Sequence, residues 1–228
     1  MDGDARFLSH HDVVRLMERA AARAQLPLTY SRGFNPRPKL SLPLPRPVGV
    51  ASRCELMVIE LDGEAEAELL AGRLRRQLPE GMTVLRADLL PPGRPPRVVS
   101  ASYELELQEQ ERPRLEKRLE ELARMETWEV TRRARPGHRR RGEKREIVDI
   151  KPGVGRLAPA ADRLSFALLS GPGSARCGEL LALLELAGPG EAPAGGVPPA
   201  AEVLARLRRT QIQWEFEPAR NEARTRQI

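Results

Sequence analysis

The stretch Ser102-Tyr103-Glu104-Leu105-Glu106-Leu107 alternates polar and apolar side chains, which is the pattern of a β-strand with one buried face. Leu115, Leu119 and Leu122 then recur at helical spacing, so a helix is expected over about residues 111–125. Further apolar runs predict strands at residues 127–131, 146–150, 164–169 and 211–216, and short helices at residues 178–186 and 200–208. This order of elements predicts a ferredoxin-like unit with an added strand over residues 98–217.

The first part of the chain predicts a similar order of elements. Ser9 can cap a helix that ends near Gln25, with Asp12 as its partner three residues on. A second helix is expected at residues 69–78, and strands are expected at residues 4–8, 28–30, 39–42, 55–61 and 82–90. The expected fold class is therefore α+β, with two tandem ferredoxin-like (βαββαβ) units that have antiparallel sheets. The first unit covers residues 1–92, and a flexible tail is expected at residues 218–228.

The composition describes a globular protein large enough to bury a core. The chain has 228 residues, of which 40% are hydrophobic and 31% charged. No apolar run approaches the roughly 18 residues that cross a membrane, and the first residues lack the basic-then-apolar pattern of a signal peptide. Two cysteines, Cys54 and Cys177, are too few for a disulfide framework, so both are expected to be buried thiols. These features predict a cytoplasmic protein without a membrane partner.

One segment carries the excess positive charge. The chain has a net charge of +6, and residues 132–145 alone contribute +7, because they hold eight basic residues against one acid, Glu143. The eight are Arg132, Arg133, Arg135, Arg139, Arg140, Arg141, Lys144 and Arg145. Clustered cations of this kind bind polyanions by releasing condensed counterions, so a nucleic-acid-binding hairpin tip is predicted here. A solvated loop without a ligand is the alternative.

A second unusual segment is Tyr30-Ser31-Arg32-Gly33-Phe34-Asn35-Pro36-Arg37-Pro38-Lys39. Gly33 and Asn35 tolerate positive φ, whereas the prolines fix φ and remove backbone donors. Two aromatic rings and three cations are set into this stiff backbone, which indicates a surface for something planar or anionic. A turn that only stabilises a hairpin is the alternative.

The histidines are the only candidates for catalysis. His10 and His11 stand beside Asp12, so either could act as a general base. Neighbouring residues on a helix point about 100° apart, however, and ligand contact or helix capping are the alternatives. The sequence shows no metal-ligand spacing, no iron–sulfur cysteine triplet, no phosphate-binding glycine loop and no nucleophile elbow. An enzyme is therefore less expected than a binding protein.

Several motifs together resemble a known family. They are Phe7-Leu8-Ser9-His10-x-Asp12, Leu26-Pro27-x-x-Tyr30-Ser31-x-Gly33-Phe34-Asn35-Pro36-x-Pro38-Lys39, Leu44-Pro45-x-Pro47-Val48-Gly49-Val50 and Lys144-Arg145-Glu146-x-x-Asp149. In these the chain resembles the radical SAM-linked protein family, whose bacterial members are encoded beside or fused to a radical SAM protein. His11 and Arg46 stand where the family pattern leads us to expect leucine.

The resemblance implies a separate radical SAM protein as partner. That partner would hold the iron–sulfur cluster and S-adenosylmethionine, and no cofactor is expected in this chain. The surface expected to meet a ligand or partner comprises Ser9, His10, Asp12, Tyr30, Ser31, Arg32, Gly33, Phe34, Asn35, Pro36, Arg37 and Lys39.

Three functions are compatible with these patterns. The first is a non-catalytic accessory module of a radical SAM protein that binds RNA or presents an RNA substrate. The second is a metal-independent RNA-processing enzyme, because tandem ferredoxin-like units with an N-terminal histidine and a glycine-containing loop are similar to the CRISPR RNA endonucleases. The third is an adaptor that binds only the radical SAM protein.

Overall fold

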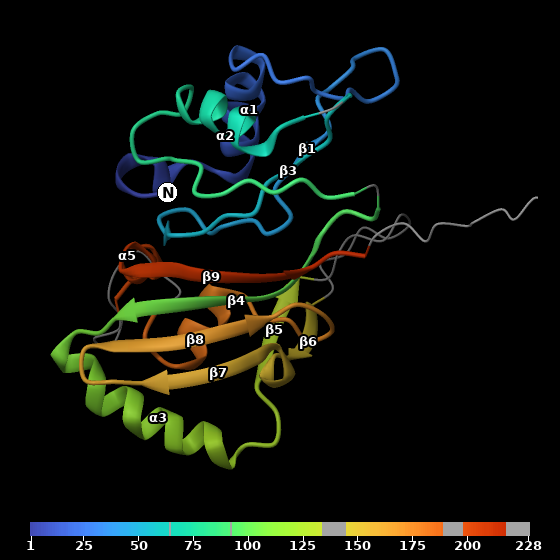
Figure 1. Ribbon diagram of the computed structural model, residues 1–228. Helices are drawn as coiled ribbons and strands as arrows, with labels where there is room; N and C mark the ends of the chain where they lie inside the picture. Colours follow the sequence, from blue (N-terminus) through green and yellow to red (C-terminus); the bar gives the residue numbers. More distant parts are fainter. Residues whose placement is uncertain (64, 92, 134–144, 189–197, 218–228) are drawn as a thin grey trace, which may run out of the picture. The chain divides into compact units, whose positions relative to one another are not determined.

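The chain forms two compact units, which are described separately. The computed structural model describes residues 1–63, 65–91, 93–133, 145–188 and 198–217 (Figure 1). Unit 1 combines Met1–Arg46 and Glu55–Val98 with the end of the last strand from Gln213. Unit 2 combines Pro47–Cys54 with Val99–Ile212.

Unit 1 contains three helices and a small antiparallel sheet. Its elements are the 3-10 helix η1 (Gly3–Phe7), α1 (His10–Arg23), β1 (Leu40–Ser41), β3 (Val58–Ile59) and α2 (Ala67–Arg75). Leu40 pairs with Ile59 and Ser41 with Val58. Two isolated bridges join the segment before β1 to this sheet: Tyr30 pairs with Pro38, and Leu28 pairs with Leu61 after β3. The chain from Leu28 to Leu40 therefore runs out and back as a hairpin.

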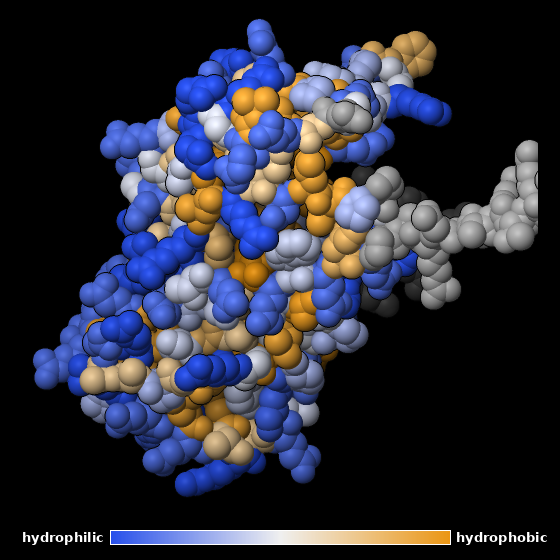
Figure 2. All heavy atoms as spheres, viewed as in Figure 1, coloured by the Kyte–Doolittle hydropathy of each residue, from blue (hydrophilic) through white to orange (hydrophobic). Residues whose placement is uncertain are grey.

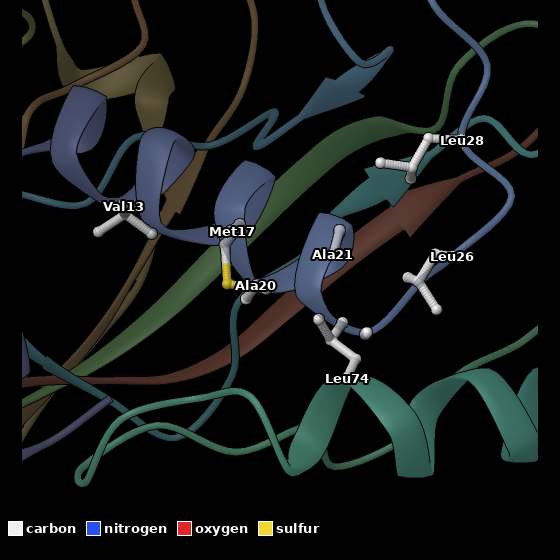
Figure 3. Close-up of a cluster of buried hydrophobic side chains, with 8 residues drawn as sticks. Val13, Met17, Ala20, Ala21, Leu26, Leu28 and Leu74 are labelled. Atoms are coloured by element: carbon white, nitrogen blue, oxygen red, sulfur yellow. The ribbon is translucent and has the colours of Figure 1, made fainter.

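The core of unit 1 lies between α1 and α2. One face of α1 is apolar and buried, through Val13, Met17, Ala20, Ala21 and Ala24 (Figure 3). Leu26 and Leu28 after the helix and Leu74 of α2 pack against this face. Burial of apolar area, worth roughly 25 cal/mol per Å², is what holds these short elements together.

Unit 2 is built on a five-stranded sheet. Its strands are β2 (Ala51–Ser52), β9 (Leu207–Glu215), β4 (Arg97–Glu106), β8 (Arg163–Leu169) and β7 (Val154–Pro159), in that spatial order (Figure 1). β2 pairs parallel with β9, whereas β8 pairs antiparallel with both β4 and β7. The end residues of β4 and β9 fall in unit 1.

Helices and a hairpin complete unit 2. The helices are η2 (Glu109–Glu111), α3 (Arg112–Arg124), η3 (Lys151–Gly153), α4 (Cys177–Leu183) and α5 (Ala200–Ala205). The hairpin consists of β5 (Glu129–Arg133) and β6 (Arg145–Asp149), which form a separate two-stranded sheet. Arg118 of α3 donates to the Leu183 carbonyl of α4 (2.8 Å), so these two helices are neighbours. Leu105, Leu115, Leu122, Leu164, Phe166, Leu180 and Leu207 are among the fully buried core side chains.

The expected α+β class is confirmed, whereas two tandem ferredoxin-like units are not. In unit 2 the strands and α-helices follow one another as β4, α3, β5, β6, β7, β8, α4, α5 and β9. The predicted strands at residues 127–131 and 146–150 form the separate β5–β6 sheet, and β7, which takes part in the five-stranded sheet, was not predicted. The strand predicted at residues 4–8 is wrong, because this segment forms η1, started by the Asp2 carboxylate, which accepts a bond from the Gly3 N–H. Residues 82–90, all of which the structure describes, form no strand.

Gly153 of η3 supplies the sharpest test of packing in unit 2. A Cβ added at Gly153 would overlap the Gly173 carbonyl oxygen and lie 2.7 Å from the Ala175 nitrogen, both of them backbone atoms. We therefore expect Gly153→Ala to lower the free energy of unfolding by about 1–3 kcal/mol, the usual cost of overpacking. Urea denaturation followed by circular dichroism measures this.

The control is Gly178→Ala in α4, where an added Cβ meets nothing within 4 Å. This variant should keep or raise the stability, because alanine favours a helix over glycine by roughly 0.5–1 kcal/mol. Equal unfolding midpoints for Gly153→Ala and the unmodified chain would contradict the close approach of η3 to residues 173–175.

Candidate functional site

The segment Tyr30–Lys39, called the Tyr30 loop below, is closed by backbone hydrogen bonds. The Ser31 N–H donates to the Arg37 carbonyl (2.8 Å), and the Arg37 N–H donates back to the Ser31 hydroxyl (2.9 Å). At the turn between them Gly33 has φ +139°, which favours glycine. The loop is therefore a closed hairpin end that projects from the helices of unit 1 (Figure 1).

A second layer of bonds supports the base of the loop. The Lys39 N–H donates to the Thr29 carbonyl (2.8 Å), and the Thr29 N–H donates to the Glu60 carbonyl (3.0 Å). The Thr29 hydroxyl also donates to the Asp62 carboxylate (2.6 Å). Lys39 pairs with Glu60 across 2.8 Å, so part of its charge is already compensated.

The side chains at the tip point into solvent. Phe34 is fully exposed (105%) and Tyr30 is half exposed (49%). Arg32 and Arg37 are exposed as well. Figure 2 shows a hydrophobic side chain next to hydrophilic ones at the outer end of this loop. The structure thus brings two rings and two exposed guanidinium groups onto one closed loop.

Ser9 and Asp12 cap the start of α1. The Asp12 N–H donates to the Ser9 hydroxyl (3.2 Å), and this hydroxyl donates to the Asp12 carboxylate (2.6 Å). The bond from Ser9 lowers the pKa of the Asp12 carboxyl below its ordinary value. Both residues are thus accounted for by the capping that the sequence predicts.

The two histidines stand side by side at the start of α1. Their rings are 5.8 Å apart at an interplanar angle of 63°, and His11 is exposed. His10 lines a small pocket together with Arg46 and Glu55. The pocket has a cavity volume of about 20 Å³, enough for about one water molecule. An endonuclease role for His10 or His11 stays a prediction.

Arg46, which departs from the family pattern, has a structural place. Its side chain is buried, and its guanidinium donates to the Arg6 carbonyl (2.7 Å) and the Ala5 carbonyl (3.4 Å) of η1. Glu55 lies 3.9 Å from the same guanidinium. A leucine could not satisfy these carbonyl oxygens. From the sequence, Arg46 was noted only as a departure from the family pattern, and its structural role was not predicted.

The β5–β6 hairpin holds both ends of the basic segment. Its register runs from Glu129↔Asp149 to Arg133↔Arg145, so the two strands predicted beside the segment are confirmed. Residues 134–144 lie outside the described residues, and with them the predicted positions Arg135, Arg139, Arg140, Arg141 and Lys144.

Arg132 has a protein partner. Its guanidinium donates to both oxygens of Glu179 at the start of α4 (2.7 and 2.6 Å) and to the Ser174 carbonyl (2.7 Å). Both side chains are mostly buried (16% and 18% exposed). Burial acts to raise the pKa of the Glu179 carboxyl, but the bonds from Arg132 and the Arg176 N–H hold it below its ordinary value. Arg132 thus anchors the hairpin to α4.

Trp128, which stands just before the basic segment, does not offer a stacking surface. The ring is buried, and its Nε1–H donates to the Leu122 carbonyl (3.1 Å). Lys151 lies over the ring at 5.9 Å from its centre. Any stacking side chain for a nucleic acid must therefore come from another part of the chain.

The sequence analysis did not single out Arg209, which is buried, or Arg206, whose side chain is mostly buried (16% exposed). Arg209 of β9 is fully buried and donates to the Tyr103 hydroxyl (3.1 Å), and Arg206 forms a two-bond ion pair with Glu111 (2.7 and 2.9 Å). Burial raises the pKa of the nearby Cys177 thiol to about 11. Cys177 is buried as predicted, whereas Cys54 is only partly buried. These groups serve packing in unit 2.

Two further properties concern only the part of the chain that the structure describes. Within it, no three His, Cys, Asp or Glu side chains gather as a metal site would require. None of its helices combines the length and the apolar character needed to cross a membrane.

Comparison with known proteins gives one family. The model of the family described as "uncharacterized protein conserved in bacteria (DUF2344)" matches residues 1–177, which contain the Tyr30 loop and the β5–β6 hairpin. No curated protein matches the sequence.

The anchor between the hairpin and α4 is testable by removing one charge. Glu179→Gln leaves the Arg132 guanidinium mostly buried without its counter-charge, and we expect the free energy of unfolding to fall by about 1–3 kcal/mol. The Glu179 pKa is lower in the folded chain than in the unfolded one. The Glu179 carboxylate therefore contributes fully to the free energy of unfolding at pH values above its unfolded pKa of about 4.3. This contribution is lost as the pH falls through the folded pKa.

Denaturation at pH 7 and at pH 3 measures the free energy of unfolding of Glu179→Gln and of the unmodified chain. The difference between the two free energies should be smaller at pH 3 than at pH 7. Asp162→Asn is the control, since its pair with Arg163 is exposed (66% and 51%) and its loss should change little. Equal effects of the two substitutions would contradict the anchor.

Proposed function

The chain belongs to the DUF2344 family of bacterial proteins, and we propose that it acts as an RNA-binding accessory module of a radical SAM protein in the cytoplasm. The partner is proposed from the motifs that resemble the radical SAM-linked protein family. The iron–sulfur cluster and S-adenosylmethionine would belong to that partner. This chain would contribute affinity for RNA and present the RNA to the partner.

The observation that supports this proposal best is that both ends of the basic segment are held by the β5–β6 hairpin, which is itself bonded to α4. Arg133 and Arg145 are paired in register, so the chain leaves and re-enters the hairpin at neighbouring positions. The Arg132–Glu179 pair fixes this hairpin to α4. Between these ends the sequence contains five basic residues and only Glu143 as an acid. An anchored cationic segment is suited to follow a phosphate backbone.

An accessory role fits unit 1 better than catalysis. The pocket beside His10 holds about one water molecule. Asp12, which could have oriented a histidine, bonds to Ser9 at the helix cap. Docking of the same chain on its radical SAM partner is compatible with RNA binding, because the two ligands would need different surfaces.

Replacing Arg139, Arg140 and Arg141 by alanine tests the proposal. We expect weaker binding of a fluorescein-labelled 20-nucleotide RNA in anisotropy titrations. The plot of log K against log salt has a negative slope, and its magnitude should decrease by about 2, since each lost phosphate contact to a single strand removes about 0.7.

The matched control replaces Arg15, Arg19 and Arg76, three exposed arginines on the helices of unit 1. This triple variant has the same net charge as the first one and should keep the unmodified slope. An equal loss in both variants would mean that net charge alone drives binding. No loss in the first variant would contradict the role of the basic segment.

A further inference from the structure

We propose that the Tyr30 loop is a stacking site for single-stranded RNA, in which Phe34 takes a base and Arg32 and Arg37 contact the neighbouring phosphates. The inference rests on the proposed RNA-binding function and adds a second contact, in unit 1. The sequence alone does not show whether this loop binds a nucleic acid, binds a protein or only forms a turn. The proposal names RNA as its ligand.

The exposure of the rings is the first observation. A phenylalanine side chain at 105% exposure has no packing partner, and Tyr30 in the same loop is 49% exposed. The closed loop keeps the Phe34 ring away from the apolar core, which it would otherwise join. Each base has a flat face that stacks on such a ring, with an effect on affinity of roughly 5- to 150-fold per base.

The stiffness of the loop is the second observation. The mutual bonds between Ser31 and Arg37 and the bond from Lys39 to Thr29 already order the backbone. Binding therefore orders few new torsions in the protein, which keeps the entropic cost low. A loop that only reversed the chain direction would not need an exposed aromatic side chain at its tip.

The charges of the loop favour an anion over a protein pocket. Every charged residue between Tyr30 and Lys39 is basic. Lys39 is paired with Glu60, whereas among the described residues no ion pair engages Arg32 or Arg37. These two guanidinium groups lie two residues before and three residues after Phe34, so they flank the ring along the loop. Guanidinium groups bind phosphate oxygens with two parallel bonds.

A single strand fits this arrangement better than a duplex. Stacking on Phe34 needs a base whose face is free, and in a duplex the faces are covered by neighbouring base pairs. Single strands are also recognised by aromatic rings with flanking cations and little sequence preference.

The test uses the full chain and two probes, a labelled 12-nucleotide oligoadenylate and a 12-base-pair RNA duplex. Phe34→Ala should weaken binding of oligoadenylate roughly 5- to 150-fold at every salt concentration, without changing the salt slope. Phe34→Leu should lose as much, and Phe34→Trp should restore binding, because stacking needs a ring. Replacing Arg32 and Arg37 together by alanine should reduce the magnitude of the salt slope by about 1.4. Binding of the duplex should change in none of these variants.

Leu85→Ala, at an exposed apolar residue elsewhere in unit 1 (71% exposed), is the matched control and should bind like the unmodified chain. If the unmodified chain binds RNA and Phe34→Ala binds equally well, the stacking site is wrong while the RNA-binding function stands. If Phe34→Leu binds like the unmodified chain, the residue acts as a general apolar contact, as in a protein pocket, and stacking is overturned. If the unmodified chain binds neither probe, the proposed function itself fails.

Discussion

The reciprocal hydrogen bonds between Ser31 and Arg37 are the interaction on which the proposed recognition surface depends. An aromatic ring in water is driven toward any apolar surface within its reach. By closing the backbone over six residues, these two bonds hold Phe34 at the tip of a hairpin that ends in solvent. The glycine at position 33 permits the turn because of its positive φ. In the sequence of this loop, Arg32 precedes Phe34 and Arg37 follows it.

Among the residues that the structure describes, some arginines have a structural role and others are exposed. Arg46, Arg132, Arg206 and Arg209 are largely or fully buried, and each donates to a carbonyl, a carboxylate or a hydroxyl oxygen of the protein. These side chains join segments that are far apart in the sequence. Arg32 and Arg37 are exposed and belong to the other class. Net charge therefore overstates how many cations can meet a ligand, and Arg132 at the edge of the basic segment is the clearest case.

The sequence predicts the elements that rest on local patterns. The alternation over residues 102–107, the cap formed by Ser9 and Asp12 and the two strands beside the basic segment are all present. Predictions that depend on distant partners are less successful. Residues 82–90 have a strand pattern but form no strand, and the carbonyl oxygens that hold Arg46 lie 40 and 41 positions away. Trp128 is buried, and the pattern of its own segment does not indicate its contacts with the Leu122 carbonyl and with Lys151.

Crosslinking tests the central claim, RNA recognition by the Tyr30 loop and the basic hairpin, most directly. The full chain is irradiated with RNA that carries 4-thiouridine, and the crosslinked residues are identified by mass spectrometry. RNA recognition predicts crosslinks at Tyr30 and Phe34 and at residues of the basic segment, with those at position 34 lost in Phe34→Ala. Crosslinks confined to other surfaces, or none at RNA concentrations that saturate binding, would contradict it.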